Sequence, residues 1–483
     1  MFFLWAVLCV FGFTNALPLQ VNPRGLDLPV CIVGAGPAGL AAAKRLESKG
    51  KKAVIFEKQA EVGGKCQTYY DKGGFHPLGA LLFSNATYTE TVKIVDEANV
   101  PIYPFSANGG GEGWNYNWTT GATMEIAATS AQFQAALGAE IGRYIQLWNQ
   151  VFAPISGVGY KKGVPHNLTV STADWLSTNG FQYFPALIIP AMTPYGYGDF
   201  RQVPILYMLQ YFTPDIILFF AGQHTGYLVD FHTVFKNFAA SLSTTQIHLN
   251  TTIEWIDRSG STPVLRYHDP HPETYHNHTE PCQHPSHTKI QVCSSLIMAF
   301  PPTLKALEGA HLDISTEEQR AFGPVGVNTY YSGAVRTRTP YGLAFRIDQT
   351  TPFTPPDADG EPVTLIKISP YSDVATTWSW GAYRVPQTIQ QAKELLKCTL
   401  SKINKDPRNA TDVAVPVTDA DVVGFRKWDY FPHYDTEQLV VGAYDKFNAL
   451  QGKQKTYYAS GLNGFETIEF AVRAGYDVAD SIC

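Results

Sequence analysis

A glycine-rich turn between an apolar strand and a helix constrains this chain more than any other feature. The apolar run Val30–Val33 leads into Gly34, Gly36 and Gly39, which have G-x-G-x-x-G spacing and open a helical pattern over residues 38–49. In such a turn the first glycine permits the tight bend, the second lets backbone approach a pyrophosphate, and the third lets helix and sheet pack closely. The segment predicts a Rossmann-type dinucleotide site with the phosphates at the helix N-terminus.

An acidic residue completes this unit. The second apolar run, Ala53–Phe56, ends at Glu57, where a carboxylate can accept a hydrogen bond from a ribose 2′-hydroxyl. A site for a 2′-phosphate would favour an arginine beside this acid, so NADP is disfavoured. The residues expected along the dinucleotide are Gly34, Ala35, Gly36, Pro37, Ala38, Gly39, Glu57 and Lys58.

The residues after the acid indicate which dinucleotide is bound. Gly63, Gly64, Lys65 and Thr68 follow Glu57 in a pattern that resembles the E-x(5)-G-G-[RK]-x-x-[ST] motif of the flavin amine oxidase and phytoene desaturase superfamily. The resemblance implies FAD, with Gly64 and Lys65 along its diphosphate and ribityl chain; a surface turn with a solvated lysine is the alternative. It further implies that Gly79 and Ala80 lie under the isoalloxazine ring and that Ile253 holds adenine through its backbone.

The C-terminal motifs extend the resemblance to the whole chain. The segments 428–433, 456–461 and 469–475 are similar in type and order to the branch that holds fungal β-cyclopiazonate dehydrogenase-like oxidases and polyenoic fatty acid isomerases. This similarity implies that Gly461, Thr467 and Ile468 face the pyrimidine and ribityl chain of the flavin at the start of the last helix, whose amides stabilise negative charge on reduced flavin.

Four residues are candidates for the chemistry near the ring: Lys427, Trp428, Tyr430 and Phe465. The lysine could position water or stabilise reduced flavin, and the aromatic residues could wall the site, although each also suits core or rim packing. Monoamine oxidases carry a flavin-linking cysteine shortly before the matching Tyr-Phe-Pro segment, and residues 425–428 contain none. Covalent attachment by that route is not expected. Cys66 could touch or link the flavin, although a packed thiol is the favoured interpretation.

These motifs predict an α/β protein with a discontinuous Rossmann-like FAD-binding domain and an α+β substrate domain. The FAD-binding domain is expected in residues 28–105, 240–305 and 413–483, and the substrate domain in 106–239 and 306–412. Helical patterns occupy 130–152, 172–179 and 186–219, the last broken by prolines, while four alternating runs within 326–383 favour an antiparallel sheet. The glycine-rich stretch after Phe105 is expected to be a loop.

Residues 1–17 have the apolar core and small-residue end of a signal peptide. Six N-x-[ST] sequons, at Asn85, Asn117, Asn167, Asn250, Asn277 and Asn409, support a secreted, N-glycosylated protein. In an oxidising compartment Cys282 and Cys293, which bracket a short loop, are the expected disulfide. Cys31 is expected to be a small core residue.

Charge and composition limit the partners. A net charge of -6 argues against nucleic acid, and no second long apolar run would span a membrane. Six of the 13 histidines lie within residues 268–293. Their spacing matches no zinc-ligand pattern, so no metal site is predicted.

The resemblance leads to an expected reaction. No second dinucleotide motif is visible for a nicotinamide, which favours an FAD-dependent oxidoreductase that passes a substrate hydride to flavin N5 and then uses molecular oxygen. The aromatic content of 13% suits large planar ligands, although such content more often reflects core packing. The expected substrate is a small, largely apolar organic molecule. Two alternatives stay open: a fatty-acid double-bond isomerase with no net redox change, and a non-catalytic secreted protein that binds flavin or metal.

Overall fold

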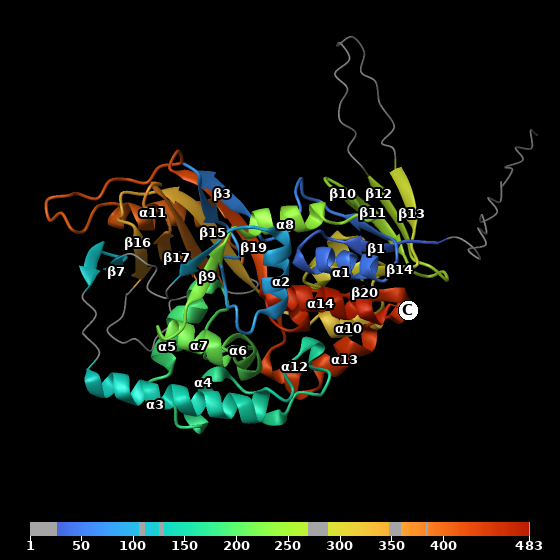
Figure 1. The fold of residues 1–483 in the computed structure, drawn as a ribbon, viewed down its shortest axis with the longest axis horizontal. Helices are drawn as coiled ribbons and strands as arrows, with labels where there is room; N and C mark the ends of the chain where they lie inside the picture. The colour runs from blue at the N-terminus through green and yellow to red at the C-terminus, as the bar shows by residue number, and fades with distance from the viewer. Residues whose placement is uncertain are drawn as a thin grey trace, which may run out of the picture.

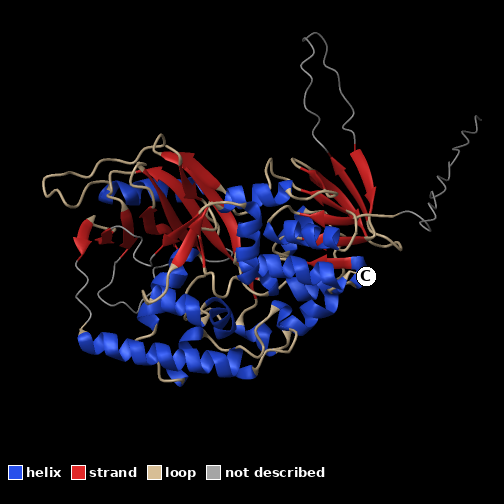
Figure 2. Cartoon of the chain, in the orientation of Figure 1, coloured by secondary structure: helices blue, strands red, loops and turns tan. Residues whose placement is uncertain are grey.

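The computed structural model describes residues 27–105, 112–124, 130–268, 288–346, 359–381 and 385–482. The expected signal peptide and most of the histidine-rich segment lie outside these residues. Strands gather in two groups, with helices between and below them (Figure 2). Among the described residues no helix is both long and apolar enough to cross a membrane.

A five-stranded parallel sheet contains the glycine turn. Its order is β10-β2-β1-β14-β20, with β1 (Val30–Val33) at the centre between β2 (Ala53–Phe56) and β14 (Ser295–Met298). The outer strands are β10 (Gln246–His248) and β20 (Thr456–Tyr458). Every residue of β1, β2 and β14 is buried, as expected for parallel strands covered on both faces.

Two helices from opposite ends of the chain pack together on this sheet. Figure 1 shows α1 (Pro37–Ser48) beside α14 (Ile468–Ser481). They approach so closely that a Cβ on Gly475 would lie 2.2 Å from the carbonyl oxygen of Ala38. The N- and C-terminal motifs are thereby brought to one side of the sheet.

Two expected single strands each divide between different sheets. Residues 246–257 form β10 and β11 (Thr252–Asp257), while residues 288–300 form β13 (Thr288–Val292) and β14. With β12 (Val264–His268), β11 and β13 make a separate antiparallel sheet. Each of these two runs could form one continuous strand. Its apolar pattern therefore does not show that the chain passes from one sheet to the other within the run.

The substrate side contains a seven-stranded sheet of order β19-β15-β18-β17-β16-β7-β8. The four expected β runs are confirmed as β15 (Gly326–Arg336), β16 (Gly342–Arg346), β17 (Asp359–Lys367) and β18 (Val374–Gly381). The glycine-rich stretch expected to be a loop contains β7 (Glu112–Asn117), which pairs in parallel with β16 and antiparallel with β8 (Ala122–Met124). Pairing with β16 thus outweighs the weak strand propensity of its glycine and asparagine.

The edge strand β19 (Val422–His433) pairs antiparallel with β15 in this sheet. These residues were expected in the FAD-binding domain. The chain returns to the parallel sheet only at β20, so β19 belongs to the substrate sheet and not to the sheet that contains the glycine turn.

Helices line the lower part of Figure 1, below the substrate sheet. The longest is α3 (Ala131–Leu147), followed by α4 (Thr172–Thr178). The pattern over 186–219 divides into α5 (Pro185–Met192), α6 (Ile205–Tyr211) and α7 (Pro214–Phe220). Prolines stand at or just before the start of each, where the missing N–H is harmless.

The remaining described elements complete the two sides. They are β3 (Thr68–Asp71), β4 (Gly74–Pro77), β5 (Leu82–Phe83), α2 (Thr89–Ala98), β6 (Ile102–Phe105), β9 (Gly226–Val229), α8 (Phe231–Ala240), α9 (Leu304–Gly309), α10 (Thr316–Phe322), α11 (Ile389–Ile403), α12 (Thr436–Val440) and α13 (Ala443–Leu450).

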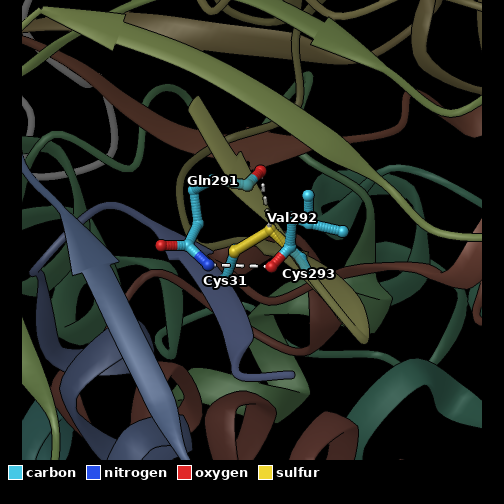
Figure 3. The surroundings of a disulfide bond; sticks show 4 residues. All are labelled: Cys31, Gln291, Val292 and Cys293. Carbon is cyan, nitrogen blue, oxygen red and sulfur yellow. Dashed lines mark hydrogen bonds between the residues drawn. A yellow bond between two sulfur atoms is a disulfide. The ribbon is translucent and has the colours of Figure 1, made fainter. Parts of the chain in front are cut away.

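The disulfide prediction is wrong. Cys293 bonds to Cys31, with 5.6 Å between their Cα atoms and a sequence separation of 262 positions (Figure 3). The cause is sheet register: Cys31 in β1 pairs with Leu296 in β14, and Cys293 lies just before that strand. Cys31 is buried as expected but is half of a bridge rather than a free thiol, while Cys282 lies outside the described residues.

Candidate cofactor cradle and substrate cavity

Two glycine loops face each other at the N-terminus of α1. Gly36 and Gly64 are so close that a Cβ on Gly64 would lie 3.0 Å from the Cα of Gly36, and Gly63 N donates to the carbonyl of Ala35 at 2.8 Å. The space beside Gly34 and Gly39 is occupied by the protein itself, since a Cβ on these residues would lie 2.9 Å and 2.0 Å, respectively, from a carbonyl oxygen. A Cβ on Gly36 would meet no heavy atom closer than the Cα of Gly64, at 3.8 Å, so the space beside Gly36 is open to a ligand.

The carboxylate of Glu57 is fixed at the edge of this cradle. Its two oxygens accept hydrogen bonds from Ala35 N at 2.7 Å and Gln59 N at 2.8 Å. A carboxylate has about four acceptor positions, so capacity for a ribose hydroxyl remains. An orientable acceptor beside a glycine turn fits the adenosine end of a dinucleotide.

A cavity of about 90 Å³ lies between the segment that follows β4 and the start of α14. Gly79 and Ala80 line one part of it, and Thr467 and Ile468, at the start of α14, line another. These four residues were predicted separately from motifs nearly 400 positions apart. The structure therefore brings the expected flavin-facing backbone segments to one cavity.

Aromatic side chains form most of the remaining wall. They include Tyr195, Tyr197, Tyr211, Tyr330, Trp378 and Tyr430. Among the described residues none that lines this cavity is Asp, Glu, Lys, Arg or His. The space is therefore suited to an apolar, planar ligand.

Comparison with known proteins agrees with this geometry. Residues 32–98 match the family model of an NAD(P)-binding Rossmann-like domain. The FAD-dependent oxidoreductase oblC of Cochliobolus heterostrophus is 25% identical over 91% of this chain and 89% of its own length. An uncharacterized mimivirus protein from Acanthamoeba polyphaga mimivirus is also 25% identical, over 94% of both chains.

Solved structures share the fold over nearly the whole chain. A fatty acid isomerase from P. acnes superposes with a TM-score of 0.76 at 20% identity, covering 94% of this chain and 98% of its own. Putrescine oxidase superposes with a TM-score of 0.62 at 15% identity, covering 95% and 99%. This chain is similar to FAD-dependent oxidoreductases and has a flavin amine oxidase-type fold. The predicted superfamily, α/β fold class, FAD cofactor and enzyme class are confirmed.

Of the four catalytic candidates of this oxidoreductase homologue, Tyr430 alone lines the cavity. Its ring stacks on Tyr330 at 4.8 Å, and its hydroxyl donates to the Tyr197 hydroxyl at 3.3 Å. Burial raises the pKa of both Tyr197 and Tyr430 well above the usual range, so both hydroxyls stay protonated. They can act as hydrogen-bond donors rather than as bases.

The other three candidates do not line the cavity. Phe465 is buried and stacks on Tyr211 at 5.1 Å. Trp428 donates from Nε1 to the carbonyl of Leu78 at 3.0 Å, which fixes the residue before Gly79. Lys427 Nζ donates to the carbonyl of Gln387 at 2.7 Å and does not line the cavity. Lys427 and Tyr430 are three residues apart in β19, so alternation along the strand puts their side chains on opposite faces of the sheet. The sequence does not show which of these faces lies toward the cavity.

The adenine end of the cradle lies beyond Glu57. Ile253 is buried and pairs with Tyr267, whose ring lies 4.8 Å from that of Phe56. Lys58 is exposed just after β2. Ile253 therefore lies on the same side as Glu57, and its backbone role stays a prediction.

Cys66 is buried and forms no disulfide. Burial raises the pKa of its thiol well above the usual range, so the thiolate needed for nucleophilic attack is scarce. A covalent flavin link through this thiol is disfavoured.

Two groups of site residues were missed from the sequence. Tyr195, Tyr197 and Tyr211 were grouped only as part of an aromatic helical region, and Glu466 was not singled out. The bend at Gly196, with φ of 82°, turns two of these tyrosines toward the cavity. The glycine-tyrosine alternation over 195–198 was the available signal.

Proposed function

We propose that this enzyme oxidises a small, largely apolar organic substrate by removing a hydride, with molecular oxygen as the final acceptor. FAD, when bound, accepts a hydride at N5 of its isoalloxazine ring. The glycine cradle and Glu57 would hold its diphosphate and ribose. Gly79 and Ala80 would lie under its ring, and Gly461, Thr467 and Ile468 would face its pyrimidine and ribityl chain. The described cavity residues include no charged side chain, and this observation favours an apolar substrate.

The cavity wall sets this preference because it offers no counter-charge. Moving an ammonium ion from water into an aromatic pocket costs several kcal/mol unless an acid pairs with it. A simple alkylamine is therefore a poor substrate for the site, whereas an uncharged conjugated or aromatic molecule buries its surface at no such cost.

The chain's own residues supply orientation and exclusion of water. Ser332 Oγ and Trp428 Nε1 both donate to the carbonyl of Leu78, at 2.6 Å and 3.0 Å, and so fix the backbone that leads into Gly79. In the cavity wall, the ring of Tyr430 stacks on Tyr330 at 4.8 Å and packs against the tilted ring of Tyr197 at 5.6 Å. Holding a substrate carbon in one place in a dry site is the contribution that a protein makes to hydride transfer.

Anaerobic mixing of the holoprotein with matched substrates tests this proposal. A set of uncharged alkenyl and aryl compounds should bleach the flavin absorption, and their primary amine counterparts should do so more slowly. Oxygen consumption on admitting air should then follow the same order. Faster bleaching by the charged amines would contradict the substrate class.

A redox-neutral isomerase is the second candidate, because the same apolar cavity suits a chain with double bonds and the P. acnes fatty acid isomerase shares the fold. It would convert such a substrate without net oxygen consumption. A flavin that no compound reduces would instead favour a non-catalytic binding protein.

We also propose that the protein is secreted and N-glycosylated. Asn85, Asn167, Asn250 and Asn409 are exposed and accessible to glycosylation, whereas Asn117 is partly buried; Asn277 lies outside the described residues. Mass loss on glycosidase treatment and a mature N-terminus near residue 18 are the expected results. An unmodified chain that retains residue 1 would contradict this proposal.

A further inference from the structure

One residue that the motifs did not single out joins the cavity wall to the cofactor loop. The main-chain carbonyl of Glu466 accepts hydrogen bonds from the hydroxyls of Tyr197 at 3.0 Å and Tyr430 at 3.4 Å. Its side-chain Oε1 accepts from Lys65 Nζ at 2.6 Å, across 401 residues of sequence. The ammonium of Lys65 also lies 5.3 Å from the centre of the Tyr430 ring.

None of the described residues donates a hydrogen bond to the second carboxylate oxygen of Glu466. Within the described part of the chain Oε2 is buried and accepts no hydrogen bond, and the side chain as a whole is only 14% exposed. A buried carboxylate oxygen without a donor is costly, and such groups normally have a partner. A donor from outside the protein is therefore expected here.

The position of this oxygen indicates what the donor is. Oε2 lies directly over Gly461, where a Cβ would be only 2.2 Å away. Both Gly461 and Lys65 are residues predicted to flank the ribityl side of FAD. The unpartnered oxygen thus lies between two elements of the cofactor cradle, and a ribityl chain carries hydroxyl donors.

We propose that Glu466 is a positioning residue for the flavin, whose Oε2 accepts a hydrogen bond from a ribityl hydroxyl while Lys65 balances its charge. This inference rests on FAD being the cofactor and does not depend on which substrate is oxidised. The pair also sets the local charge beside the ring system. Removing the acid leaves an uncompensated ammonium that favours reduced flavin, and removing the lysine leaves an uncompensated carboxylate that disfavours it.

Two variants of the full-length holoprotein test the role. E466Q keeps the side-chain shape, and we expect FAD to be released about tenfold faster on dilution, because a charge-assisted hydrogen bond is lost. Its two-electron midpoint potential should rise, by about 30 mV for each tenfold change in the ratio of affinities for reduced and oxidised FAD. K65M should shift the potential in the opposite direction. FAD fluorescence and an anaerobic titration against a reference dye give the two readouts.

A matched surface pair provides the control. Lys453 and Glu317 are also 2.6 Å apart, but their side chains are 49% and 60% exposed, so E317Q should leave FAD release and potential unchanged. A merely structural ion pair would lower the melting temperature of E466Q and K65M without moving the potential, and that result would overturn the inference. If E466Q does not accumulate as a folded protein, K65M alone tests the inference: an unchanged or raised midpoint potential of K65M would also overturn it. A wild-type protein that carries no FAD would overturn the cofactor assignment itself.

Discussion

Replacing Gly36 by alanine should weaken FAD binding while leaving the fold intact. The residue has φ of −75°, which alanine adopts without strain, and the added Cβ would meet no protein atom closer than 3.8 Å. The methyl group instead occupies the space through which a diphosphate approaches the helix N-terminus. Losing one charge-assisted hydrogen bond there costs about 1.5–3 kcal/mol, which corresponds to a roughly 10- to 100-fold weaker affinity.

Gly39 provides the matched control, because it lies in the same turn but serves packing. A Cβ there would lie 2.0 Å from the carbonyl oxygen of Gly34, so G39A should lower the free energy of unfolding by about 1–3 kcal/mol or more. FAD titrations and urea unfolding of both variants separate the two effects. Equal destabilisation by G36A and G39A, or G36A with wild-type affinity for FAD, would refute the division between a cofactor glycine and a packing glycine.

Three further predictions concern other parts of the protein. C31S should lower the free energy of unfolding by roughly 2–5 kcal/mol, since the bridge closes a long loop, and C282S should not; urea unfolding of both checks the pairing. Burial raises the pKa of Glu318, but hydrogen bonds led by that from Arg258 outweigh it and lower the pKa from 4.5 to about 2. Its stabilisation is therefore present above about pH 4.5 and lost as the pH falls toward 2, so E318Q should be less stable by roughly 2–3 kcal/mol at pH 7 and match wild type near pH 2; a pH-independent difference in unfolding would be the contrary result. K427M should leave the rate of flavin reduction unchanged in stopped-flow assays, because the Lys427 ammonium binds the carbonyl of Gln387 and Lys427 does not line the cavity; a large loss of rate would make it catalytic after all.

The sequence predicts local structure around the cofactor well because each motif contains its own physical reason. The strand, glycine turn, helix and acid over residues 30–57 lie within one short stretch, and the structure forms β1, α1 and β2 there. The proline positions likewise mark where the helical region before Phe220 breaks. No distant contact is needed to derive these features.

Features set by pairing between distant strands could not be derived in this way. The Cys31–Cys293 bridge depends on β1 lying beside β14, and β7 forms because β16 offers it a partner. A nearest-neighbour argument instead favours Cys282 and treats the glycine-rich segment as a loop.

The candidate site shows the same division. Gly79, Ala80, Thr467 and Ile468 follow from motifs and meet at the cavity. The side that Lys427, Trp428 and Tyr430 face depends on the register of β19 against β15, which the sequence does not reveal. The role of the Glu466 carboxylate can be inferred only from its contact with Lys65, which the sequence does not reveal.

The visible absorption spectrum of the purified protein, before and after acid precipitation, shows whether the protein binds FAD and how. We expect flavin bands that move into the supernatant, because the cradle holds FAD without a covalent bond. Bands retained in the pellet would contradict the non-covalent site and direct attention to Cys66. A colourless protein that acquires no bands on incubation with FAD would contradict the oxidoreductase itself.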